Sequence, residues 1–197
     1  VFVAKFTPTG EIVFATLIGG TKREHHSGIT VDEAGYIYIA GGTESSDFPV
    51  TKGAYDTSFN GARSWGGDVF VTKLNPTGTE IVFSTFIGGE VQETIGSGGI
   101  KVDSEGNIII VGITASHDFP LTQGVIDNND NMHAFLSKLS PDGQKLLFST
   151  FFGSSSREGI AGLTIDDKDN IYISGATLTA GLPVTDNAFR KKIIIPK

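Results

Sequence analysis

Residues 70–89 read FVTKLNPTGTEIVFSTFIGG, and two other parts of the chain repeat this stretch closely. The copies are FVAKFTPTGEIVFATLIGG at residues 2–20 and FLSKLSPDGQKLLFSTFFGS at residues 135–154. In each copy, two apolar runs flank a four-residue turn with Pro in second place and Gly in fourth place, which favours a type I turn. Each copy therefore predicts two antiparallel strands joined as a hairpin.

A second repeated stretch supplies two more strands for each unit. It reads GITVDEAGYIYIAG from Gly28, GGIKVDSEGNIIIVG from Gly98 and GLTIDDKDNIYISG from Gly162. In the third copy Asp169 replaces the turn Gly, and Asp tolerates the left-handed conformation expected there better than most residues. Four short strands in each repeat are typical of a propeller blade. We predict a single all-β propeller or partial propeller over residues 1–197, with repeats at about 1–68, 69–134 and 135–197.

A third repeated motif, SSDFPVTKGAYD from Ser45, returns as SHDFPLTQGVID from Ser116 and as AGLPVTDNAFR from Ala180. We expect it to begin the long connection between the second and third strands of a blade and to staple the blade edge. Its Pro holds the preceding residue extended and donates no hydrogen bond to a ladder. Asp47 and Asp118 are expected to have a capping role rather than to bind a ligand. A ligand residue would be needed in every blade, and the third copy has Gly181 in their place.

Composition agrees with an all-β chain and excludes some partners. The chain has 26 Gly, 14 Phe, 1 Met and no Cys, which suits turns and strands better than helices. Its net charge of −7, with both signs interspersed, argues against nucleic acid as a partner. No apolar run reaches the roughly 20 residues that a membrane-spanning helix needs.

Counting strands predicts an incomplete blade, here called a half-blade, at each end of the chain. Three blades cannot close a ring, because closed propellers use four to eight. In one interpretation, the N-terminal half-blade of one copy pairs with the C-terminal half-blade of another, and two chains form six blades with two-fold symmetry. In the other, the remaining blades lie in sequence beyond this chain, which a start without Met supports.

The stretches FVTKLNPTGTEIVFSTFIGG and GIKVDSEGNIIIVGITASHDFPLT resemble the bacterial and archaeal SBBP family, a seven-bladed β-propeller repeat. The resemblance implies a propeller module of the kind found in large secreted or surface-attached proteins, and hence an extracellular or cell-surface location. It implies no catalytic motif. By analogy with related propellers, GITVD is the strand that lines the central channel.

Glu24, Glu93 and Glu158 stand at matching positions before the channel-lining strands. A ring of carboxylates at one channel mouth could bind Ca²⁺ or Mg²⁺, which prefer oxygen ligands. Alternatively, each Glu accepts backbone N–H bonds in its own loop or pairs with Arg23 or Arg157. No other cofactor is expected.

Trp65 and Arg63 lie in NGARSWGGD, a long and Gly-rich version of the variable connection. Such residues are favoured in contacts with ligands, so they could stack on a sugar or a peptide. Alternatively, Trp65 covers the edge of its own blade.

No Ser/His/Asp constellation or phosphate-binding loop can be defended, so we expect no enzymatic activity. The preferred function is a non-enzymatic extracellular scaffold or binding module that mediates protein or carbohydrate interactions or assembly. Two alternatives stay open: a self-assembling structural surface protein completed by neighbouring subunits, and a propeller-type hydrolase or lyase. Fold alone does not decide among them.

Overall fold

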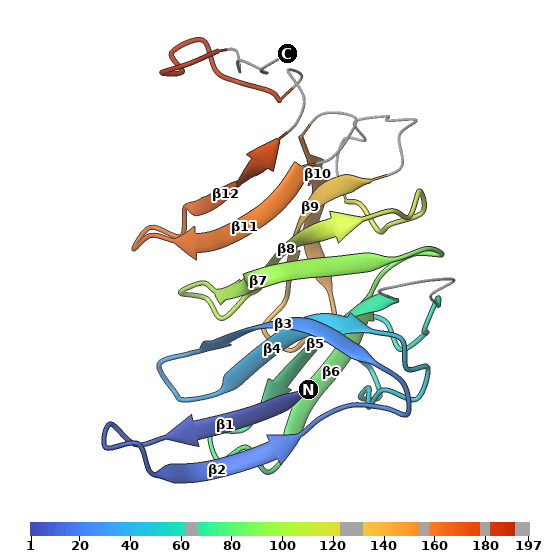
Figure 1. The fold of residues 1–197 in the computed structure, drawn as a ribbon, viewed down its shortest axis with the longest axis vertical. Coiled ribbons are helices and arrows are strands. Elements are labelled where there is room, and N and C mark those ends of the chain that lie inside the picture. Colours follow the sequence, from blue (N-terminus) through green and yellow to red (C-terminus); the bar gives the residue numbers. More distant parts are fainter. Residues whose placement is uncertain (62–66, 123–131, 154–157, 178–181, 192–197) are drawn as a thin grey trace.

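The computed structural model describes residues 1–61, 67–122, 132–153, 158–177 and 182–191, and all regular elements in these ranges are β-strands (Figure 1). One complete sheet contains β3 (Glu24–Val31), β4 (Ile37–Thr43), β5 (Asp68–Leu74) and β6 (Ile81–Ile87) in that order. The other contains β7 (Glu93–Val102), β8 (Ile108–Thr114), β9 (His133–Leu139) and β10 (Leu146–Phe152). All neighbouring strands in these sheets are antiparallel.

A two-stranded sheet stands at each end of the chain. The N-terminal half-blade pairs β1 (Phe2–Phe6) with β2 (Ile12–Leu17), and the C-terminal half-blade pairs β11 (Glu158–Ile165) with β12 (Ile171–Thr177). The predicted propeller blades and both half-blades are therefore confirmed. Each complete sheet takes two strands from one sequence repeat and two from the next, and this shift produces the half-blades. The boundaries of the domain stay a prediction.

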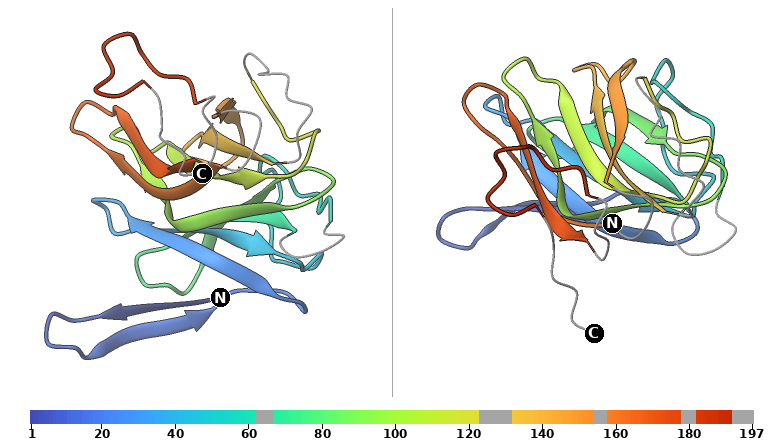
Figure 2. Two further views of the ribbon diagram at one scale, coloured as in Figure 1. Left: turned by 45° about the horizontal axis from the view of Figure 1, so that its top comes forward. Right: turned by 90° about the horizontal axis from the view of Figure 1, so that it is seen from above.

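The four sheets pack face to face, with the half-blades at opposite ends of the stack (Figure 1). Strand β7 contacts both β3 and β11, so these first strands of successive blades lie side by side. Figure 2 shows the same succession from two further directions. Apolar clusters fill the spaces between sheets: Val3 and Phe70 belong to the cluster beneath the N-terminal half-blade, and Val111 and Leu163 to the cluster beneath the C-terminal one.

An aromatic ring on β2 and another on β6 each fit against a turn glycine of the next blade. A Cβ atom at Gly78 would overlap the ring of Phe14, and one at Gly143 would overlap the ring of Phe83. Both glycines also have positive φ, +69° in each case, which disfavours other residues. Gly10 occupies the same turn in the N-terminal half-blade, but a Cβ atom there would have no contact within 4 Å beyond its chain neighbours.

The repeated DFP motif staples the blade edge as predicted. Phe48 stacks on Phe70 with 4.4 Å between ring centroids, and the equivalent Phe119 lies 4.5 Å from Phe135 in the second complete sheet. The connection then runs along the fourth strand, where the N–H of Thr51 donates to the carbonyl of Ser84 at 2.9 Å. The otherwise free edge of β6 is thereby covered.

Candidate functional site

The first strand of each blade begins with a Glu and is followed by a turn that begins with an Asp. The Glu residues therefore lie on one side of the stack, here called the Glu end, and the Asp turns on the opposite side, here called the Asp end. The Glu end contains Glu24 and Glu93, which are the first residues of β3 and β7 rather than loop residues. The Asp end contains the turns that begin at Asp32, Asp103 and Asp166.

Glu24 forms hydrogen bonds to its own blade and to the loop that precedes it. Its Oε1 atom accepts from the hydroxyl of Ser45 at 2.7 Å, from the hydroxyl of Thr43 at 3.3 Å and from the N–H of Gly20 at 3.1 Å. These bonds tie the start of the first strand to the end of the second strand and to the preceding loop. The carboxylate thus stabilises the blade joint.

Glu93 repeats this arrangement in a fully buried setting. Its Oε1 accepts from the hydroxyl of Thr114 at 2.7 Å, and its carboxylate also accepts from Ser116 and from the N–H of Gly89. Burial raises the pKa of Glu93 above its usual range, although these donors oppose the shift. The repeated Thr-x-Ser pair before each DFP motif was the sequence signal for these partners.

The Asp residues of the DFP motif cap the neighbouring loop, which confirms their predicted role. Asp47 Oδ1 accepts from the N–H of Thr21 at 2.9 Å and from its hydroxyl at 3.1 Å. The backbone bond from Thr21 is the main reason why the pKa of Asp47 is lowered. Asp118 accepts in the same way from the N–H of Glu90 at 2.9 Å.

The described residues show no metal-binding arrangement for the predicted ring of Glu carboxylates. The side chain of Glu158 is not among those that the structure describes, whereas Glu24 and Glu93 accept hydrogen bonds from their own blades and from the loops that precede them. Within the described ranges, no group of three or more His, Cys, Asp or Glu side chains could hold a metal ion. A ligand role for these Glu residues stays a prediction.

A second buried carboxylate, which no motif in the sequence indicates, lies beside Glu93. Asp68, the first residue of β5, is fully buried, and neither its Oδ1 nor Glu93 Oε2 has a hydrogen-bond partner. Both atoms face Gly88, where a Cβ would lie 2.7 Å from the former and 2.8 Å from the latter. Burial raises the pKa of Asp68 to about 7; the N–H of Asn60 opposes this shift, and the nearby carboxylate of Glu93 adds to it.

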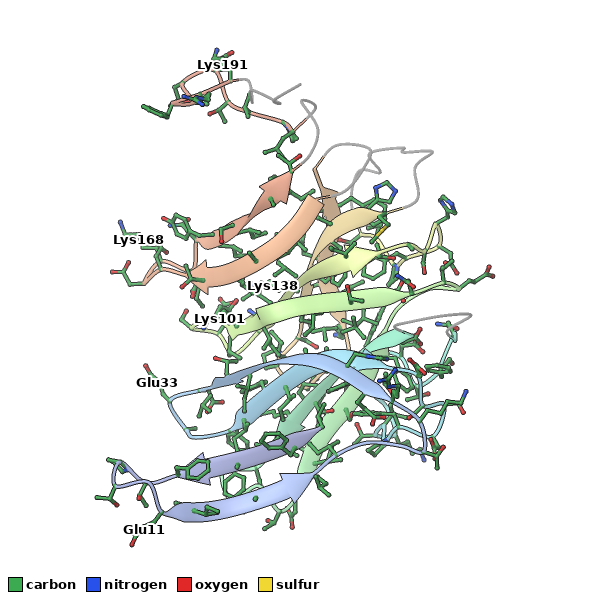
Figure 3. The ribbon with its side chains drawn as sticks, viewed as in Figure 1. Glu11, Glu33, Lys101, Lys138, Lys168 and Lys191 are labelled. Atoms are coloured by element: carbon green, nitrogen blue, oxygen red, sulfur yellow. The ribbon has the colours of Figure 1, made fainter. Side chains whose placement is uncertain are left out.

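The Asp end forms a broad recess of about 700 Å³ lined by the three Asp turns. Figure 3 shows Glu33, Lys101 and Lys168 along this side of the stack. Inside the second sheet, Lys138 Nζ lies 2.6 Å from Asp103 Oδ2 and joins the third strand to the turn. Burial raises the pKa of Asp103, but the bonds from Lys138 and Asn107 outweigh it and hold the value below its usual range.

Three other polar or aromatic residues, Trp65, Arg63 and His25, complete the list of site candidates. Trp65 and Arg63 lie outside the described residues, so their ligand role stays a prediction. His25 belongs to β3, where it pairs with Gly42 of β4, and its Nε2 lies 2.6 Å from Glu44 Oε1.

The comparison with protein families agrees with the resemblance seen in the sequence. The model of the SBBP family, described as a beta-propeller repeat, matches residues 13–49, which run from β2 to the DFP motif. No curated protein matches the chain. No helix in the described ranges has the length and apolar character needed to cross a membrane.

Proposed function

We propose that the chain is a non-enzymatic extracellular scaffold of the β-propeller type, which acts by joining its half-blades to further blades. The observation that supports this proposal is the contrast between the two kinds of sheet. Complete blades cover their edges and engage Glu24 and Glu93 in hydrogen bonds within the protein, whereas among the described residues β1 and β12 each pair with a neighbouring strand on one edge only. Unpaired strand edges are templates for pairing with another chain.

The direction of the free backbone groups on β1 can be worked out from its pairing with β2. Val1 donates to and accepts from Ile18, so its backbone groups point toward the β2 side. Backbone direction alternates along a strand, and the N–H of Ala4 therefore points toward the free edge. Pro at this position blocks edge pairing but leaves the β1–β2 ladder intact.

Size-exclusion chromatography with light scattering tests the proposal on the wild-type chain and on Ala4→Pro. The wild type is expected to form a species above 20.8 kDa, and Ala4→Pro is expected to return to that mass. Ala4→Val keeps the N–H and should behave as the wild type. Unchanged circular dichroism would show that Ala4→Pro folds. A wild-type chain that stays monomeric at all concentrations would refute the assembly role.

A further inference from the structure

The half-blades expose large apolar side chains that complete blades bury. Phe2 is 76% exposed, whereas its equivalent Phe70 is 0% exposed. Leu17 is 83% exposed, and its equivalent Phe86 is 1% exposed. Exposed apolar surface of this extent marks an interaction site. Val13 of the same hairpin is exposed, and so is its equivalent Val82 in a complete blade. The additional exposure of Phe2 and Leu17 is therefore limited to positions that the missing half of the blade would cover.

The C-terminal half-blade contains a recess that corresponds to a phenylalanine site in a complete blade. In the first sheet, Gly41 pairs with Phe70, and a Cβ at Gly41 would lie 2.9 Å from that ring. Phe48 stacks on the same ring. The equivalents of Gly41 and Phe48 are Gly175 and Leu182, and both line a recess of about 340 Å³.

We propose that Phe2 of a second copy of this chain fills the recess at Gly175 and Leu182, while β1 of that copy pairs with the free edge of β12. The result is a composite blade, made of β11–β12 from one copy and β1–β2 from the other. This inference rests on the proposed assembly function and names its partner. Main-chain pairing supplies the attachment, and the Phe in its recess fixes the register.

The complete blades define that register. Tyr38 pairs with Lys73 in the first sheet, so the equivalent Tyr172 pairs with Lys5 of the second copy. Lys73 Nζ lies 4.9 Å from the centroid of the Tyr38 ring, which is within cation–π range.

The charged residues of the two half-blades also match in this register. In the second sheet, the Lys equivalent to Lys5 is Lys138, which forms an ion pair with Asp103. Asp166 occupies the position of Asp103 in the C-terminal half-blade, and Lys5 of the second copy would meet it. The Lys on β1 and the Asp in the turn before β12 therefore carry opposite charges, in addition to the match between Phe2 and its recess.

The Phe–Gly contacts between neighbouring blades, continued across the joint between two copies, also predict a closed ring. Phe14 and Phe83 each meet the turn glycine of the next blade, while a Cβ atom at Gly10 would have no such contact. Phe148 is the equivalent ring of the second complete sheet, and it would meet Gly10 of the second copy. Each copy contributes two complete sheets and two half-blades, so two copies form six blades with two-fold symmetry.

Disulfide trapping tests this register, because the chain has no native Cys. Lys5→Cys and Tyr172→Cys, purified separately, mixed and mildly oxidised, should give a cross-linked pair on a non-reducing gel. Lys5→Cys mixed with Ser174→Cys, which is two residues out of register, should cross-link at least about tenfold less because diagonal Cβ atoms are too far apart. Lys5→Cys alone should not cross-link.

A second measurement tests the Phe site directly by sedimentation equilibrium. Phe2→Ala should raise the dissociation constant of the two-copy complex by at least about 100-fold, since large-to-small changes at buried sites have effects of this size. Val13→Ala, on the same hairpin, should change it less than about twofold because this position stays exposed in complete blades.

The outcomes separate this inference from the proposed function. Three results would overturn the two-copy ring: trapping in the shifted register, an equal effect of the two hairpin variants, or an assembly of a mass other than two chains. In each case, an assembly that Ala4→Pro abolishes would still support the scaffold role. A wild-type chain that stays monomeric would refute both the two-copy ring and the scaffold role. A discrete two-chain species trapped by Lys5→Cys and Tyr172→Cys would support both.

Discussion

Asp68→Asn should make the protein more stable at pH 8 and remove the loss of stability that this carboxyl causes between pH 4 and 7. The folded state holds the pKa of Asp68 at about 7, against an ordinary value of 3.8, because the carboxyl is buried and faces Glu93. The folded chain keeps this proton while the unfolded chain releases it, so stability falls as pH rises through this range. Each pKa unit corresponds to about 1.4 kcal/mol, and the loss is therefore at most about 4 kcal/mol.

Urea unfolding of both proteins at half-unit pH steps measures this effect. The difference between the two free energies of unfolding cancels the titration of groups that do not interact with Asp68. It retains the titration of Asp68 and its coupling to Glu93 and Asp56, which both raise the pKa of Asp68. We expect the difference to be near zero at pH 4 and to grow to about 2–4 kcal/mol in favour of Asp68→Asn at pH 8. Parallel curves for the two proteins would show that Asp68 is ionised at neutral pH and would refute the reasoning.

Four further substitutions test the packing by urea unfolding. Gly143→Ala should cost about 2–4 kcal/mol, because it adds a clash with an aromatic ring to the strain of a left-handed residue, whereas Gly53→Ala, with φ of +84° and open surroundings, should cost about 1 kcal/mol. Lys138→Met should cost about 2–4 kcal/mol at pH 7 and less at pH 3, where Asp103 can protonate. Phe119→Ala should cost about 3–5 kcal/mol, and an unchanged midpoint would show that the DFP ring is not a core residue.

The fold could be predicted because its determinants are local and repeated. The turns at Gly10, Gly78 and Gly143 each have a glycine with positive φ and a hydrogen bond that spans the turn, as their sequences indicate. Asp169 has φ of 61°, as expected from its place in the repeat. Repetition also fixed the order of strands, since the same four runs recur in the same sequence.

The buried polar contacts could be predicted only in part, because they depend on contacts between distant residues. Glu93 is recognisable as a repeated residue, yet its hydroxyl partner Thr114 lies on the adjacent strand. Asp68 gives no repeat signal at all, since His133 occupies its position in the second sheet. Its burial beside Glu93 arises where two blades meet, and a single repeat does not contain that information.

Edge protection gives a physical reason why a composite blade would be more stable than two separate half-blades. In complete blades, the connection after the second strand covers the fourth strand, as Thr51 does at Ser84 and Thr122 does at Ser149. Thr185 is the equivalent residue after β12, and it belongs to the half-blade that lacks a fourth strand. Joining β12 to β1 of another copy would therefore satisfy both free strand edges and also bring this connection to the uncovered edge of β2. The same strand order and the same contacts that stabilise each complete blade would then recur at every joint of the ring.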